Sequence, residues 1–130
     1  MLSLPASVRI FAARERIDFR IGFDGLCAIV RDRFSEDPLS GHLFLFVNKR
    51  ANRVKILVWD RNGFWLFYKR LERGTFELIR GRGAKVEIDR ARLAMLLDGI
   101  DTRKSTSRRN FVREVRIHSR ADDERARAAE

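Results

Sequence analysis

The acidic residues are the first candidates for chemistry, because a metal-dependent nuclease or transposase core needs several carboxylates that converge on one or two metal ions. The set to consider is Asp18, Asp24, Asp60, Asp98 and Asp101. Each has a structural explanation instead: the start of a helix, where acids stabilise the dipole, a tight turn, where Asp is common, or a helix end. We therefore predict that the chain is not an enzyme. A metal-dependent nuclease is the alternative, which DNA cleavage with magnesium or manganese would reveal.

The cysteine and histidine content gives no indication of a metal or cofactor site. Cys27 is the single cysteine, so neither an internal disulfide nor a multi-cysteine metal site can form. It lies in an apolar stretch, which is typical of a buried small side chain. His42 and His118 are far apart, with no ligand spacing around either. The sequence predicts no metal and no cofactor.

The charge balance indicates a polyanionic partner. The 130 residues carry a formal net charge of +10, and a cation placed near a phosphate gains free energy by releasing counterions. Nucleic acid is the usual polyanion for a small basic domain, although a membrane surface or an acidic protein would also satisfy the charge. The N-terminus lacks the pattern of a signal peptide, and no apolar run approaches the length of a membrane span. These features predict a cytoplasmic protein that binds no membrane.

The residue types that could bind a nucleic acid gather in a predicted antiparallel meander. Three apolar runs with short breaks form its strands, at residues 42–48, 53–59 and 64–70. Asn62-Gly63 favours a hairpin at the second break, because both residues tolerate positive φ. Turns at 49–52 and 60–63 then place Lys55 opposite Phe46 on one side and Tyr68 on the other. Side chains alternate between the two faces of such a sheet.

The two faces of the meander differ in character. One face is apolar throughout and is the predicted core: Leu43, Leu45, Val47, Val54, Ile56, Val58, Trp65 and Phe67. The other face is mixed, and its end near the first turn forms a basic and aromatic patch together with Lys49, Arg50, Lys69 and Arg73. The patch is the candidate nucleic-acid site: Lys49, Arg50, Arg53, Lys55, Tyr68, Lys69, Arg70 and Arg73. Rings can stack on unpaired bases while cations hold phosphates. The alternative is that a helix covers the apolar part of this face and its cations form a solvated rim.

The remaining elements complete a small α+β domain. We predict a first strand at 7–12, a helix at 23–34 with Asp18 available to cap it, and weaker strands at 75–80 and 85–88. A second helix follows Asp89 as its N-cap and ends at Gly99. The predicted fold is thus α+β, an antiparallel β-meander of about five strands with two main helices. Residues 1–101 form the domain and residues 102–130 a basic tail, disordered or weakly helical.

Several segments resemble the TnpB-type accessory proteins of the sixty-six class of bacterial insertion sequences. They span residues 18–26, 37–44, 53–66, 68–76 and 93–101. The most specific motifs are Lys55-Ile56-Leu57-Val58-Trp59-Asp60 and Lys69-Arg70-Leu71-Glu72-Arg73-Gly74. Proteins of this class are encoded beside a separate, larger DDE-type transposase.

The resemblance implies an accessory role in transposition, without catalysis of strand transfer. The partners that it implies are DNA, as the ends of the insertion sequence, and the transposase of the same element. We expect contact with DNA through the basic patch. The alternative is a protein-interaction module that docks on the transposase through exposed apolar residues of the second sheet face, namely Phe44, Leu57, Trp59 and Leu66.

Overall fold

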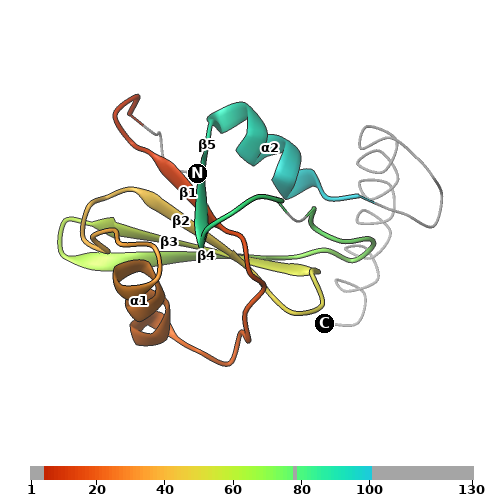
Figure 1. Ribbon diagram of the computed structural model, residues 1–130, viewed down its shortest axis with the longest axis horizontal. Coiled ribbons are helices and arrows are strands. Elements are labelled where there is room, and N and C mark those ends of the chain that lie inside the picture. Colours follow the sequence, from red (N-terminus) through yellow and green to blue (C-terminus); the bar gives the residue numbers. More distant parts are fainter. Residues whose placement is uncertain (1–4, 78, 101–130) are drawn as a thin grey trace, which may run out of the picture.

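A five-stranded sheet with one helix on each face makes up the fold, shown in Figure 1 as a computed structural model that describes residues 5–77 and 79–100. The elements in chain order are β1 (Ile10–Ala13), α1 (Phe23–Asp32), β2 (Leu43–Val47), β3 (Arg53–Asp60), β4 (Gly63–Arg70), β5 (Lys85–Ile88) and α2 (Arg90–Asp98). The predicted α+β class and the two helices are confirmed. The tail predicted over residues 102–130 lies outside the described residues.

The strands lie in the order β4-β3-β2-β1-β5. The meander of β2, β3 and β4 has the predicted register, with Lys55 opposite Phe46 and Tyr68. The sheet is not antiparallel throughout, because β1 pairs with β2 in parallel and with β5 in the antiparallel direction. The turn between β3 and β4 forms where it was predicted, but the positive φ falls on Arg61, at 58°, rather than on Asn62 or Gly63.

The strand predicted over residues 75–80 does not form in the described part of that segment. Thr75 makes an isolated bridge with Ile100, and the Phe76 N–H donates to the Ala51 carbonyl at 2.6 Å. Phe76 is buried in the core as a result. The segment therefore closes one end of the core instead of extending the sheet, and β1 and β5 complete the sheet beyond β2.

One core lies between the sheet and α2. It contains the predicted inward residues of β2 and β3, with Leu93 and Leu96 of α2 packed against them. The Asp89 carboxylate caps α2 by accepting from the Arg92 N–H at 2.7 Å. The prediction was wrong for Trp65, which is 52% exposed and donates from its indole N–H to the Asp60 carboxylate at 3.1 Å. It lies on the edge strand, where little covers a side chain.

A second core lies between α1 and the other face of the sheet. Leu26 and Val30 of the helix and Phe34 after it pack on Phe44, Phe46 and Leu57. A helix therefore covers this face, as the structural alternative predicted. The proposed docking surface is wrong for Phe44 and Leu57, which are fully buried. Asp18 does not cap α1, because the N-cap position is Gly22 and receives no side-chain hydrogen bond.

Candidate nucleic-acid interface

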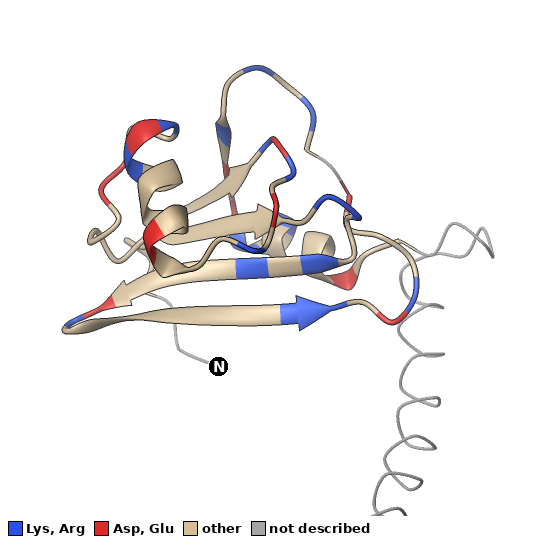
Figure 2. Ribbon diagram, turned by 90° about the horizontal axis from the view of Figure 1, so that it is seen from below, with Lys and Arg blue, Asp and Glu red and all other residues tan. Residues whose placement is uncertain are grey.

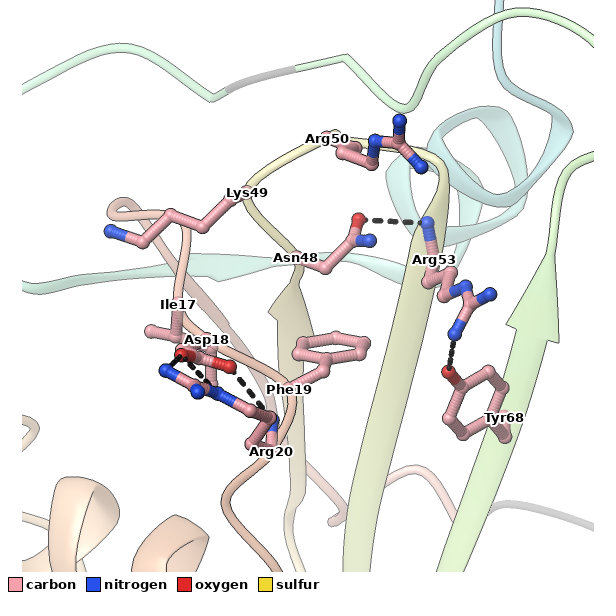
Figure 3. A pocket seen from close by; sticks show the side chains of 9 residues that line it. All are labelled: Ile17, Asp18, Phe19, Arg20, Asn48, Lys49, Arg50, Arg53 and Tyr68. Atoms are coloured by element: carbon pink, nitrogen blue, oxygen red, sulfur yellow. Dashed lines mark hydrogen bonds and ion pairs between the residues drawn. The ribbon is translucent and has the colours of Figure 1, made fainter.

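A pocket of about 310 Å³ opens where the turn after β2 meets the segment before α1. We call it the basic pocket. Figure 3 shows its lining residues: Ile17, Asp18, Phe19, Arg20, Asn48, Lys49, Arg50, Arg53 and Tyr68. Four of the predicted site residues belong to it, namely Lys49, Arg50, Arg53 and Tyr68. The volume and the four cations suit a small anionic group such as a phosphate.

Asn48 builds the turn that carries the exposed cations of the pocket. Its side-chain carbonyl accepts from the backbone N–H groups of Asn52 and Arg53, at 3.0 and 2.9 Å, and its amide donates to the Asn52 side chain at 2.8 Å. Ala51 takes a left-handed conformation with φ of 58°. These contacts close the turn tightly, so Lys49 and Arg50 stand exposed on its outer side.

The segment before α1 forms the opposite wall. The Ile17 N–H donates to the Val47 carbonyl at 3.0 Å, in a parallel bridge that brings this segment beside the turn. Asp18 accepts from the Arg20 guanidinium at 2.6 Å and from the Arg20 backbone N–H at 2.9 Å. These hydrogen bonds, together with the positive charge of Arg20 and Lys49, lower the pKa of the Asp18 carboxyl. The carboxylate is therefore ionised at neutral pH and offsets part of the pocket's positive charge.

The third wall comes from β3 and β4. The Arg53 guanidinium donates to the Tyr68 hydroxyl at 3.0 Å, across two directly neighbouring strands. Tyr68 is 50% exposed and meets Phe19 edge-on, with ring centroids 6.1 Å apart. The hydroxyl thus holds the guanidinium without removing its charge, and a half-exposed ring borders the cations.

Lys55 lies beneath the pocket rather than on its surface. It is only 7% exposed, and its ammonium donates to the backbone carbonyls of Phe19 and Ile21 at 3.1 and 3.4 Å. The same group lies 4.7 Å from the Phe19 ring centroid, a cation–π distance. Because its ammonium donates to the segment before α1, Lys55 has a structural role. We therefore do not include it among the residues expected to contact a nucleic acid.

The other three predicted site residues lie outside the pocket. Lys69 points to the opposite face of β4, where its ammonium donates to the Leu97 carbonyl at the end of α2, at 2.7 Å. Arg70 forms an ion pair with Glu72 at 3.0 Å. Arg73 follows β4 and does not line the pocket either. The structure thus divides the predicted patch into a hollow with unpaired cations and a rim whose cations have other partners.

Sequence reasoning missed the wall formed by Ile17, Asp18, Phe19 and Arg20. Its contact with the turn depends on the parallel pairing of Ile17 with Asn48, two residues far apart in the chain. Neither periodicity nor spacing reports such a pairing. The one available signal was the family-like segment at 18–26, which includes Asp18 and Arg20.

Within the part of the chain that the structure describes, no group of three or more His, Cys, Asp or Glu side chains could hold a metal ion. Cys27 is partly buried, and this burial raises the pKa of its thiol. Among residues 5–77 and 79–100, no helix has the length and apolarity that a bilayer crossing requires.

Comparison with known proteins decides the family. The model of the IS66 Orf2 like proteins matches residues 8–107, which include both helices, all five strands and the basic pocket. The chain belongs to the IS66 Orf2 like family. This membership confirms the resemblance read from the sequence and associates the chain with an accessory role in the IS66 transposition system. IS66 Orf2 like proteins are not a known enzyme class.

Two curated relatives come from Sinorhizobium fredii, and both are described as uncharacterized proteins. The protein y4hO is 37% identical over 103 residues, covering 79% of this chain and 90% of its own. The protein y4jC is 32% identical over 101 residues, covering 78% and 86%. No solved structure shows a significant match to this IS66 Orf2 like chain.

Proposed function

We propose that this IS66 Orf2 like protein is a non-enzymatic accessory factor of transposition that contacts DNA through the basic pocket. The expected ligand is the phosphate backbone at an end of the insertion sequence, and the expected protein partner is the transposase of the same element. Lys49, Arg50, Arg53 and Arg20 supply the cations, and Tyr68 supplies an exposed ring beside them.

One observation carries the proposal: three of the four cations that line the pocket lack acidic partners within the described part of the chain. Among the described residues, Lys49, Arg50 and Arg53 form no ion pair, whereas other arginines of the domain are paired, such as Arg9 with Glu87 and Arg33 with Glu15. An unpaired surface cation needs no exchange of partners before it meets a phosphate. Counterion release then supplies the free energy of binding.

The pocket is better suited to phosphates than to base edges. Reading an adenine edge requires a free donor and a free acceptor on one side chain, such as the amide of an Asn or Gln. The Asn48 amide instead uses its carbonyl and one of its N–H groups inside the turn. Phosphate contacts fix the position of a protein on DNA without selecting a sequence. We therefore expect binding that depends strongly on salt and weakly on DNA sequence.

The test is a fluorescence anisotropy titration of a labelled DNA duplex with the full chain. The K49Q/R50Q variant removes two cations of the pocket, and R31Q/R61N is the matched control. Arg31 and Arg61 are exposed and lie outside the pocket, and Asn accepts the positive φ of position 61. Both variants lower the net charge by the same amount, so a difference between them reports position and not total charge.

At about 50 mM salt, K49Q/R50Q is expected to bind DNA about tenfold more weakly than the wild type. The slope of its log binding constant against log salt concentration should fall by the contribution of about two phosphate contacts. R31Q/R61N is expected to stay close to the wild type. Equal losses of affinity in the two variants would contradict the proposed site, because they would show only the general attraction of a basic protein to DNA. Absence of binding by the wild type at low salt would overturn it.

A further inference from the structure

A second group of cations lies around the segment after β1, which leads into the pocket wall. The loop at residues 79–84 carries Arg80 and Arg82, both exposed, on either side of Gly81. This loop rests on Arg14: the Arg14 N–H donates to the Ala84 carbonyl at 2.9 Å. Any Cβ at Gly81 would come within 1.8 Å of the Arg14 guanidinium. The glycine thus permits a close approach of backbone and cation. We call Arg14, Arg16, Arg80 and Arg82 the arginine cluster.

The positive charge of the arginine cluster is not neutralised. Among the described residues, none of its four members forms an ion pair, and two buried nitrogens of Arg14, Nε and Nη1, have no hydrogen-bond partner. The acids beside these arginines in the sequence already pair with other cations: Glu15 pairs with Arg33, and Glu77, before the loop, pairs with Arg92. The cluster therefore has a surplus of guanidinium charge.

Backbone contacts connect the arginine cluster to the basic pocket. Arg14 and Arg16 lead directly into Ile17, whose backbone bridges to the end of β2 beside the pocket turn. Figure 2 shows basic positions on the loop at 79–84, on the segment after β1, on the turn after β2 and at the ends of β3 and β4, with acidic positions among them. Each step in this series is a backbone contact or a strand pairing. The arginine cluster and the three pocket cations without an ion pair among the described residues, Lys49, Arg50 and Arg53, are linked in this way, and we call them together the band.

We propose that the arginine cluster is a second phosphate-binding site and that the band as a whole holds the backbone of double-stranded DNA. This inference rests on the proposed function and extends it by naming the second contact and the form of the ligand. The cluster contains no aromatic side chain that could stack on an unpaired base. Arginine guanidinium groups bind phosphate oxygens well, often with two hydrogen bonds at once. Phosphate contacts at two separate places suit a duplex, whose backbone presents charge at regular intervals.

The experiment uses the full chain and compares R80Q/R82Q with K49Q/R50Q, with R31Q/R61N and with the wild type. Each double variant is titrated with a labelled duplex and with a single strand of the same sequence, at about 50 mM and about 200 mM salt. Arg80 and Arg82 are exposed loop residues, so their substitution should leave the fold intact. Circular dichroism and thermal unfolding of each variant verify this, and R16Q on the neighbouring segment provides an independent probe of the cluster.

R80Q/R82Q is expected to weaken duplex binding about tenfold at the lower salt concentration. The slope of its log binding constant against log salt concentration should fall by the contribution of about two phosphate contacts, and R16Q should show a smaller loss of the same kind. Wild-type duplex binding by both R80Q/R82Q and R16Q, alongside a loss in K49Q/R50Q, would overturn the second site and leave the proposed function standing. Wild-type binding by all three variants would overturn both. A loss with the single strand as large as with the duplex would overturn the assignment to double-stranded DNA.

Discussion

The β3–β4 hairpin has an open end and a closed end, and both carry cations and aromatic rings. At the open end, Arg53 donates to Tyr68 beside the exposed turn with Lys49 and Arg50. At the closed end, Trp65 donates to Asp60 and packs on Phe67, with Arg61 at the tip of the turn. The open end faces a second wall, the segment with Asp18 and Arg20, and encloses a pocket with it.

The comparison shows that composition alone does not define a binding site. An exposed tryptophan beside an arginine looks suitable for nucleic acid at the closed end, yet the cation there stands alone next to an acid. At the open end, the turn after β2 and the start of β3 bring Lys49, Arg50 and Arg53, which form no ion pair with any described residue, to a hollow that two other segments complete. We expect the two ends to respond differently to matched substitutions.

The largest difference concerns the core beneath each end. Phe46 is fully buried under the open end and stacks on Phe34 with centroids 5.6 Å apart, whereas Phe64 near the closed end is only partly buried. F46A should lower the free energy of unfolding by about 3–5 kcal/mol, because it leaves a cavity that its neighbours cannot fill. F64A should cost distinctly less. Urea unfolding of both variants measures this, and equal losses would contradict the packing described above.

A smaller effect is expected for Lys55. K55M keeps the length of the side chain but leaves the carbonyls of Phe19 and Ile21 without their donor, which should cost about 1–3 kcal/mol of stability. K69M is the matched control, because Lys69 also donates to a backbone carbonyl but is exposed. It should cost less than K55M. If K55M kept its stability and lost DNA binding, Lys55 would be a contact residue after all.

The smallest effect comes from the acids of the two ends. D18N removes the one carboxylate of the pocket, so DNA binding at neutral pH should become a few-fold tighter, equivalent to about one added phosphate contact. D60N at the closed end should leave the affinity unchanged. Anisotropy titrations at one low salt concentration compare the two variants. Tighter binding by D60N but not by D18N would place the DNA at the closed end and contradict the proposed site.

The same carboxylate sets the expected pH dependence. The pKa of Asp18 is lowered by Arg20, so the Asp18–Arg20 pair contributes stability above the ordinary pKa of an aspartate and loses it as the pH falls through the lowered value. Between about pH 6 and about pH 8 the charge of Asp18 is constant. DNA affinity should therefore be flat over this interval, whereas a strong dependence would indicate another titrating group in the interface.

The sequence predicted those features of the fold that depend on local patterns. Alternation and turn length set the register of β3 against β4, so Lys55 was placed correctly opposite Tyr68. The capping of α2 by Asp89 followed from residue type alone. The position of β1 beside β2 was not predicted, because a parallel pairing between distant segments leaves no local pattern. The exposure of Trp65 depends likewise on what covers an edge strand.

The site was predicted only where strand pairing defines it. Arg53 and Tyr68 are cross-strand neighbours on one face of the hairpin, so alternation was enough to bring them together. The burial of Lys55 depends on the carbonyls of Phe19 and Ile21, which belong to a segment that strand pairing does not position. The Asp18–Arg20 wall was missed for the same reason.

The most direct test of the account is an amide NMR titration of the chain with a DNA duplex at low salt. Binding through the open end predicts shifts at residues 17–20 and 48–53 and at Tyr68, with the turn at residues 60–63 unaffected. Shifts that centre on the turn at 60–63, or that spread evenly over all exposed basic residues, would contradict the central claim that the basic pocket is where this protein meets DNA.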